Sequence, residues 1–163
     1  MQPPIDLDTT GIDAALGRKG TADGGIDKFT IARQESIAAD GHVLPPTFGV
    51  TTINFQPVGG GKAAINGDFV MTAPEVQKVI QALRKGGIDV VALHNHALGD
   101  EPRLFYAHYW AVEDGVTLGQ GAAPCPGRHE PHPRELTEPP CVGSVGRGEL
   151  QQRGVTVRAR GTG

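Results

Sequence analysis

The sequence predicts an α+β fold: an antiparallel or mixed sheet with helices packed on one face, in the order α-β-β-β-α-β-β, followed by a low-order tail. Three observations predict it. Short runs of alternating apolar and polar residues indicate strands, an amphipathic segment at 73–86 indicates a helix, and the composition changes after Leu118. The 163 residues are therefore expected to hold one folded domain over 5–118 and a Gly/Pro/Arg-rich tail over 119–163.

The first two elements are a short helix and a strand. Thr10 is the expected N-cap of a helix over 11–16, in which apolar residues recur at i, i+3 and i+4. A glycine follows this segment and ends the helix. A strand is expected over 28–33, where Phe29 and Ile31 alternate with polar neighbours.

Two longer strands occupy the middle of the chain. They are expected over 50–56 and 62–71, joined by a loop that contains the glycines 59–61. Inside the second strand, Asn66-Gly67 marks either a β-bulge or a tight hairpin turn.

The segment 73–86 carries the clearest helix signal. Thr72 and Glu75 have the spacing of a capping box, in which each side chain satisfies a free amide of the first turn. Arg84 and Lys85 favour the negative carboxyl end, and two glycines follow them. The apolar positions form one stripe that can pack on a sheet: Val76, Val79, Ile80 and Leu83.

A second hairpin completes the predicted domain. Its first strand is expected over 88–98, which begins with β-branched residues, and a turn follows over 99–102. The returning strand is expected over 103–111 and is rich in aromatic residues. A further helix begins at about 113–118, and glycines interrupt it.

This hairpin carries the candidate site. Side chains alternate between the two faces of a strand, so His94 and His96 share one face. His108 lies on the same face if the strands 88–98 and 103–111 pair so that the numbers of two opposite residues add up to an even number, as for His94 opposite His108. Val91 and Leu93 then pack beneath the helix on the other face. A slip of one residue would place His108 on the wrong face.

Three imidazoles on one rigid surface suit zinc or another divalent metal. Glu101, on the connecting turn, is a candidate fourth ligand or a general base acting on metal-bound water, and Asp100 is the next candidate. Tyr106 and Trp110 share the histidine face and can wall a small-ligand site, although core packing or a domain interface explains them equally well.

Three functions therefore stay open. The first is a binding module for a divalent metal or a small ligand. The second is a metal-dependent hydrolase with Glu101 as general base. The third is a structural or interaction domain, in which the histidines are exposed polar residues or bond to backbone and tyrosine.

Composition and charge argue against other classes. The formal net charge is −3 and no Lys/Arg cluster is present, so a nucleic-acid partner is not expected. No apolar run approaches the roughly 20 residues that span a bilayer. The amino terminus lacks the features of a signal peptide, which predicts a cytoplasmic location for the chain as written.

The tail differs from the domain in composition. Residues 119–163 contain no aromatic residue, and one third of them are Gly or Pro, so they bury too little apolar area to offset ordering of the backbone. They hold four residues of metal-ligand type whose spacing fits no common zinc finger: Cys125, His129, His132 and Cys141.

Two segments carry a family resemblance: INFQPVGGGKAAINGDFVMTAPEV (53–76) and ALHNHALGDEPRLFYAHYWA (92–111). Together with a weaker match over 12–25, they resemble the LppY/LpqO family of bacterial lipoproteins, a domain family without an established function. The resemblance implies that relatives are exported and tend to carry two copies of this domain. This chain resembles the second copy, so a homodimer or pairing with another copy is expected.

The chain departs from that family after Trp110. The family pattern implies an amphipathic closing helix, which starts over 112–118 and then gives way to Gly/Pro/Arg-rich sequence. A shifted reading frame and a genuine divergent tail both account for this change. Loss of the helix would uncover apolar sheet surface and would lower solubility or promote dimerisation.

Overall fold

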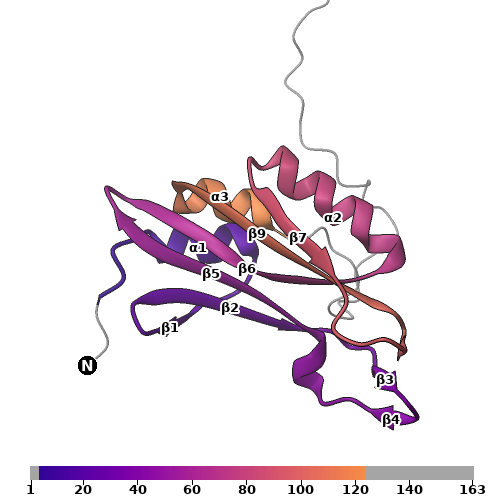
Figure 1. The fold of residues 1–163 in the computed structure, drawn as a ribbon. Coiled ribbons are helices and arrows are strands. Elements are labelled where there is room, and N and C mark those ends of the chain that lie inside the picture. The colour runs from indigo at the N-terminus through magenta and orange to yellow at the C-terminus, as the bar shows by residue number, and fades with distance from the viewer. Residues whose placement is uncertain (1–3, 124–163) are drawn as a thin grey trace, which may run out of the picture. The chain divides into compact units, whose positions relative to one another are not determined.

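The structure, a computed structural model, describes residues 4–123. Its main feature is a six-stranded sheet in the order β1-β2-β5-β6-β9-β7 (Figure 1). Every neighbouring pair is antiparallel, which confirms the predicted α+β class. The strands are β1 (Thr21–Asp23), β2 (Ile26–Ala32), β5 (Val50–Gly59), β6 (Lys62–Thr72), β7 (Asp89–His94) and β9 (Leu104–Asp114).

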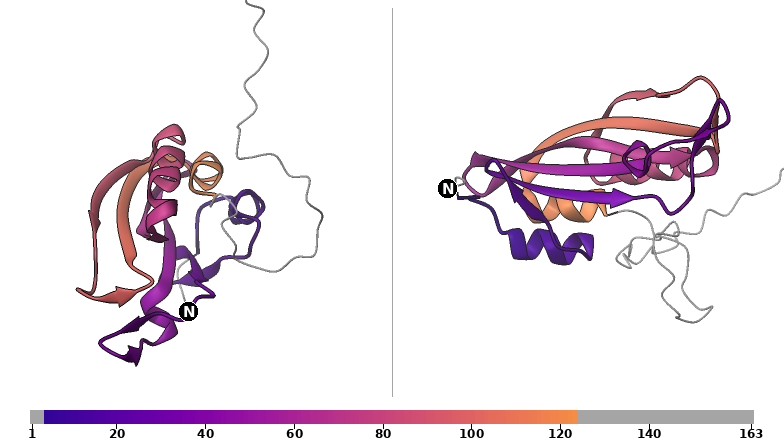
Figure 2. Two further views of the ribbon diagram at one scale, coloured as in Figure 1. Left: turned by 90° about the vertical axis from the view of Figure 1, so that its right-hand side faces the viewer. Right: turned by 90° about the horizontal axis from the view of Figure 1, so that it is seen from below.

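Three helices cover one face of this sheet, as predicted (Figure 2). They are α1 (Thr9–Leu16), α2 (Ala73–Lys85) and α3 (Gly115–Ala122). Apolar side chains from the helices and from alternate sheet positions form the main core. Its fully buried members include Ile12, Phe29, Ile53, Phe55, Ile65, Met71, Leu83, Ile88 and Leu118.

The opposite face, here called the open face, is partly covered at one end. A three-stranded sheet in the order β4-β3-β8 consists of β3 (Ala38–Ala39), β4 (His42–Val43) and β8 (Asp100–Glu101). A 3₁₀ turn over Pro46–Gly49 follows it. Together they bury a second, smaller cluster against the open face: Ile37, Val70, Leu104 and Tyr106, with Leu44 and Phe48 packed on it.

The start of α1 corrects the predicted cap. Asp8, not Thr10, is the N-cap, and its carboxylate accepts the N–H of Gly11 at 2.9 Å. Both residue types cap helices well, so local preference did not decide between them. The helix consequently begins at Thr9 and ends at Gly17, which has the left-handed φ of 66°.

Helix α2 confirms the predicted capping box. Glu75 accepts the backbone N–H of Thr72 at 2.7 Å and its hydroxyl at 2.9 Å. The same carboxylate bonds to Arg33 of the segment after β2 at 2.8 Å. The first turn of α2 is therefore tied to the sheet by a charged pair that helix periodicity does not predict.

Gly67 marks neither a bulge nor a turn. Residues on both sides of it pair without interruption, with β5 on one side and β9 on the other. A Cβ at this position would run into the carbonyl oxygen of Thr52 and the hydroxyl of Tyr109, and φ is +150°. Glycine is required here for a close approach of neighbouring groups rather than for a change of chain direction.

The end of the domain also differs from the prediction. Strand β7 ends at His94 instead of residue 98, and β9 continues to Asp114 instead of 111. Helix α3 then extends to Ala122, beyond the predicted stretch 113–118. The predicted low-order remainder, including the four tail residues of metal-ligand type, lies outside the described residues.

Small residues explain why the glycines of α3 do not break it. A Cβ at Gly119 would lie 3.1 Å from the Cβ of Ala15, so the glycine permits close packing of α3 on α1. Leu118 and Ala122 are buried in the main core. The uncovered apolar surface expected from a missing helix therefore does not arise at this position.

Candidate functional site

The pairing of β7 with β9 decides where the histidines point. At the start of β7, Val90 lies opposite Tyr109; after a register shift, Ala92 lies opposite His108. This bulge changes the sum of paired residue numbers from odd to even. Beyond it, His94 falls on the open face together with His108, as the predicted register requires.

The same bulge makes the predicted core position of Val91 wrong: this extra residue of β7 is 66% exposed. Leu93 lies opposite Ala107 of the main core, on the predicted face, but it is 45% exposed and does not pack into that core. Val90 packs against the main core instead. Apolar alternation in the sequence does not reveal the extra residue, so the assignment of faces fails at the start of this strand.

The three imidazoles touch one another in a row. His94 Nε2 lies 2.9 Å from His96 Nε2, which is hydrogen-bond distance. The rings of His94 and His108 are stacked, with centroids 4.8 Å apart and planes 20° apart. On the other side, His96 stacks on Tyr106 at 3.5 Å.

A carboxylate that the sequence analysis missed lies beside His108. Asp68 Oδ1 is 2.7 Å from His108 Nδ1, and the carbonyl of Gly67 is 3.3 Å from the same nitrogen. A carbonyl oxygen can only accept, so the hydrogen bond to Gly67 requires the ring proton to lie on Nδ1. Only the β6–β9 register, which places Asp68 opposite His108, brings these two residues together.

The predicted metal ligands do not form a complete set. Within residues 4–123, no group of three or more His, Cys, Asp or Glu side chains is placed to hold a metal ion. His94 and His96 face each other, whereas Nδ1 of His108 is engaged by Asp68. The arrangement brings the rings together without directing three nitrogens at one point.

The two acidic candidates lie in the smaller sheet. Glu101 is exposed in β8 and pairs with Ala38. Asp100 is buried, accepts the N–H of Leu104 at 2.8 Å and lies 3.3 Å from Arg103. Asp100 therefore holds the β8–β9 turn together.

The two aromatic candidates differ in their surroundings. Tyr106 is 2% exposed and donates its hydroxyl to the carbonyl of Phe48 at 2.7 Å. Burial, with smaller effects of Asp100 and Asp68, raises the pKa of Tyr106 to about 12. Trp110 is 48% exposed, so its indole is the one available to contact a ligand from solvent.

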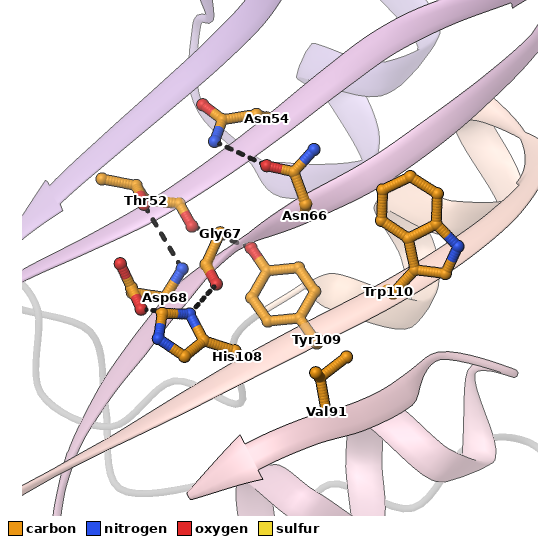
Figure 3. Close-up of a pocket in the computed structure, with 9 residues that line it drawn as sticks. All are labelled: Thr52, Asn54, Asn66, Gly67, Asp68, Val91, His108, Tyr109 and Trp110. Carbon is orange, nitrogen blue, oxygen red and sulfur yellow. Dashed lines mark hydrogen bonds and ion pairs between the residues drawn. The ribbon is translucent and has the colours of Figure 1, made fainter. Parts of the chain in front are cut away.

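The uncovered part of the open face contains a shallow hollow of about 610 Å³, here called the open-face hollow (Figure 3). Its lining is Thr52, Asn54, Asn66, Gly67, Asp68, Val91, His108, Tyr109 and Trp110. A second hollow of about 450 Å³ adjoins it and shares Thr52 and Asp68; there His96 and Tyr106 face Thr30, Pro45, Thr47, Phe48 and Val50. Within the part of the chain that the structure describes, no Lys or Arg lines either hollow.

Two asparagines in the open-face hollow were also missed from the sequence. Asn54 donates its amide to Asn66 Oδ1 at 3.2 Å. This leaves Asn54 Oδ1 buried without a hydrogen-bond partner among the described residues. Polar alternation along the predicted strands 50–56 and 62–71 was the available signal, because it places these side chains opposite the core.

Histidine titration gives a direct test of the imidazole row. Burial lowers the pKa of His96 below its ordinary 6.5, nearby His94 and His108 lower it further, and Asp68 acts in the opposite direction. Replacing His94 with alanine is therefore expected to raise the pKa of His96. NMR titration of the imidazole signals measures it, with Leu98→Ala, at a 99% exposed side chain, as the control. An unchanged His96 pKa in the His94 variant would contradict the observed ring contact.

The family model described as Domain of Unknown Function (DUF1259) matches residues 10–125. The chain belongs to the DUF1259 family. The match runs from α1 past α3, so this DUF1259 domain includes every residue of both hollows. Comparison with curated proteins and with solved structures found no match. Among the helices within residues 4–123 of this family member, none has the length and apolar character to cross a bilayer.

Proposed function

We propose that this DUF1259 domain binds a small polar ligand in the open-face hollow. The observation that carries the proposal is the concentration of polar groups with free bonding capacity beside a half-exposed aromatic ring. His108 supplies an imidazole, Asn66 supplies an amide N–H group, and Trp110 supplies apolar surface. Binding sites commonly combine a few directed polar groups with aromatic walls.

The hydrogen bond between Asn54 and Asn66 holds the two amides side by side in the hollow. Asn54 is the donor in this bond and Asn66 Oδ1 the acceptor, so the bond does not use the amide N–H groups of Asn66. An acceptor atom of a ligand can bind to them, beside the half-exposed ring of Trp110.

The chain offers a convenient probe, since Trp110 is its only tryptophan. A panel of monosaccharides, nucleosides, amino acids and sugar acids is screened by Trp110 fluorescence and by NMR shifts of the asparagine amides. We expect a ligand that changes both the fluorescence and the amide shifts. Its affinity should fall about tenfold in Asn66→Ala, as loss of one hydrogen bond predicts.

The matched control for that screen is Gln81→Ala. Gln81 is exposed on α2, which packs on the other face of the sheet. The Gln81→Ala variant is expected to bind the ligand with the affinity of the wild type. Ligand-induced shifts that avoid the hollow, or an equal loss in both variants, would reject the open-face hollow as the site.

A divalent metal at His94 and His96 is a second candidate function. Two metal–nitrogen bonds of about 2.1 Å place the nitrogens about 3.0 Å apart at the right angle of square-planar coordination, as for nickel, and about 3.4 Å apart in tetrahedral zinc. The observed Nε2–Nε2 distance of 2.9 Å is compatible with the right-angled geometry. Completion of the site requires His108 to turn its ring toward the pair, and in the hydrolase version Glu101 serves as general base.

Calorimetry with zinc and nickel tests the metal proposal. We expect His94→Ala to abolish binding, and His42→Ala, at an exposed histidine of β4, to leave it unchanged. Glu101→Gln distinguishes the two versions, because a general base affects hydrolysis but not metal affinity. Equal affinity in the His94 and His42 variants would contradict a site at this pair. The closer assignment to the LppY/LpqO proteins stays a prediction that rests on segments 53–76 and 92–111.

A further inference from the structure

We infer that the ligand of the open-face hollow is a neutral polyhydroxylated ring, of the chemical class of an uncharged monosaccharide. This inference rests on the proposed function and specifies its ligand class. Four features of the hollow support it: the size of its polar surface, its charge, the bonding capacity of its amides and the position of Trp110.

The polar surface has the footprint of one sugar ring. It spans three adjacent strands and two outward positions on each: Thr52 and Asn54 on β5, Asp68 and Asn66 on β6, and His108 and Trp110 on β9. Strand spacing and rise make such a grid about 10 Å by 7 Å. A single six-membered ring with its hydroxyls covers that area, whereas an extended peptide would exceed it.

The charge of the lining argues for a neutral ligand. Among residues 4–123, no Lys or Arg lines the hollow, so a phosphate or carboxylate would find no such cation there. Asp68 is the acidic lining residue, and His108 already lies 2.7 Å from it. A cationic ligand would have to displace that contact.

The bonding groups match vicinal hydroxyls. Each hydroxyl donates one hydrogen bond and accepts others, and the asparagine side chains do both. After the internal bond between the two amides, Asn66 still offers Nδ2 as donor. The imidazole of His108 adds a polar group on the neighbouring strand.

Trp110 lies at the end of this polar grid, beside Asn66 (Figure 3). Its side chain is 48% exposed, so a broad apolar surface borders the hydrogen-bonding groups. A pyranose has an apolar C–H face and a polar rim of hydroxyls. The indole can pack against the apolar C–H face while the neighbouring amides form hydrogen bonds with the hydroxyls.

The experiment titrates the full chain with glucose, galactose, mannose and N-acetylglucosamine. Glucuronate and glucose 6-phosphate serve as charged analogues, and adenosine and glutamine as neutral ligands of other classes. For a ligand of this size on an open surface, we expect a dissociation constant on the order of 1 mM for at least one neutral sugar. The charged analogues of that sugar should bind at least about tenfold more weakly, since the lining lacks a cation.

Variants locate the binding. Asn66→Ala and Trp110→Ala are expected to weaken sugar binding about tenfold or more by NMR, whereas Trp110→Phe, which keeps an aromatic surface, retains most of it. Gln81→Ala is unchanged. Dispersed amide spectra that match the wild type show that each variant is folded.

Each result has a distinct meaning. Binding in the hollow by adenosine, glutamine or only the charged analogues overturns the sugar inference and leaves the proposed function standing. Sugar binding that Asn66→Ala does not weaken also overturns the inference, because the site would lie elsewhere. If no member of the panel shifts the hollow's signals at about 50 mM, far above the expected constant, both are overturned.

Discussion

Gly67→Ala is expected to lower the free energy of unfolding by about 3 kcal/mol or more. Replacing a glycine inside a strand with alanine usually raises the free energy of unfolding by about 0.5–1 kcal/mol, so the effect expected at Gly67 has the opposite sign. The reason is that its Cβ would meet the carbonyl oxygen of Thr52 and the hydroxyl of Tyr109, in a backbone with φ of +150°. Chemical denaturation followed by Trp110 fluorescence measures the change.

Gly49→Ala provides a matched control for this substitution. Gly49 is also buried, but its added Cβ would make ordinary contacts, the nearest at 3.6 Å to Arg33. We expect a change within about 0.5 kcal/mol of the wild type. Similar losses in both glycine variants would show that the close approach at Gly67 is not the cause.

The same close approach supports the candidate site. Tyr109 donates its hydroxyl to Thr52 at 2.8 Å through the space that a side chain at Gly67 would occupy. Gly67 also offers its carbonyl to His108. A destabilised Gly67 variant should therefore lose ligand binding in the open-face hollow together with stability.

Arg33→Met is expected to cost about 2–3 kcal/mol of stability. The guanidinium is 4% exposed and bonds to Glu75 at 2.8 Å, to the Val70 carbonyl at 3.1 Å and to Glu35 at 2.8 Å. The cost stays below that of a fully buried ion pair because both carboxylates remain partly hydrated. Arg84→Met is the control, since the Arg84–Asp89 pair is mostly exposed and worth about 0.5 kcal/mol or less.

Acidification should reduce the effect of the Arg33 substitution. Burial raises the pKa of Glu75, but hydrogen bonds from Arg33 and Thr72 together outweigh burial and hold it below the ordinary 4.5. A lowered folded pKa means that the stabilisation is present above pH 4.5 and is lost as the pH falls through the folded value. Chemical denaturation at pH 7 and at acidic pH measures the difference in free energy of unfolding between the wild type and Arg33→Met. A difference that does not change with pH would contradict the charged pair.

Local sequence signals predicted the elements whose cause is local. The capping box of Thr72 and Glu75 and the apolar stripe after it define α2 almost to the residue. The alternation of apolar and polar residues located β2, β5 and β6, and only the ends of these strands differ from the prediction, by at most a few residues. Glycines misled where packing required them: Asn66-Gly67 suggested a bulge or a turn, and the Gly-rich composition after Leu118 suggested the end of the domain.

The candidate site depended on contacts between distant segments. The sequence indicated that His94 and His108 share a face, but only the bulge in β7 makes that register hold. It gave no indication of Asp68 as the neighbour of His108, since 40 residues separate them. The sequence also did not show that Tyr106 is buried and Trp110 half-exposed, because both side chains fall on the same face of the strand.

The amino-acid sequence by itself determined the α+β class, the helix at α2 and the chemical types gathered on the last hairpin, because periodicity and capping act over a few neighbouring residues. The tertiary structure alone decided which side chains of β5, β6 and β9 adjoin one another. Strand register and a single inserted residue are set by packing between segments far apart in the chain. The hollow beside Trp110 is a product of that register.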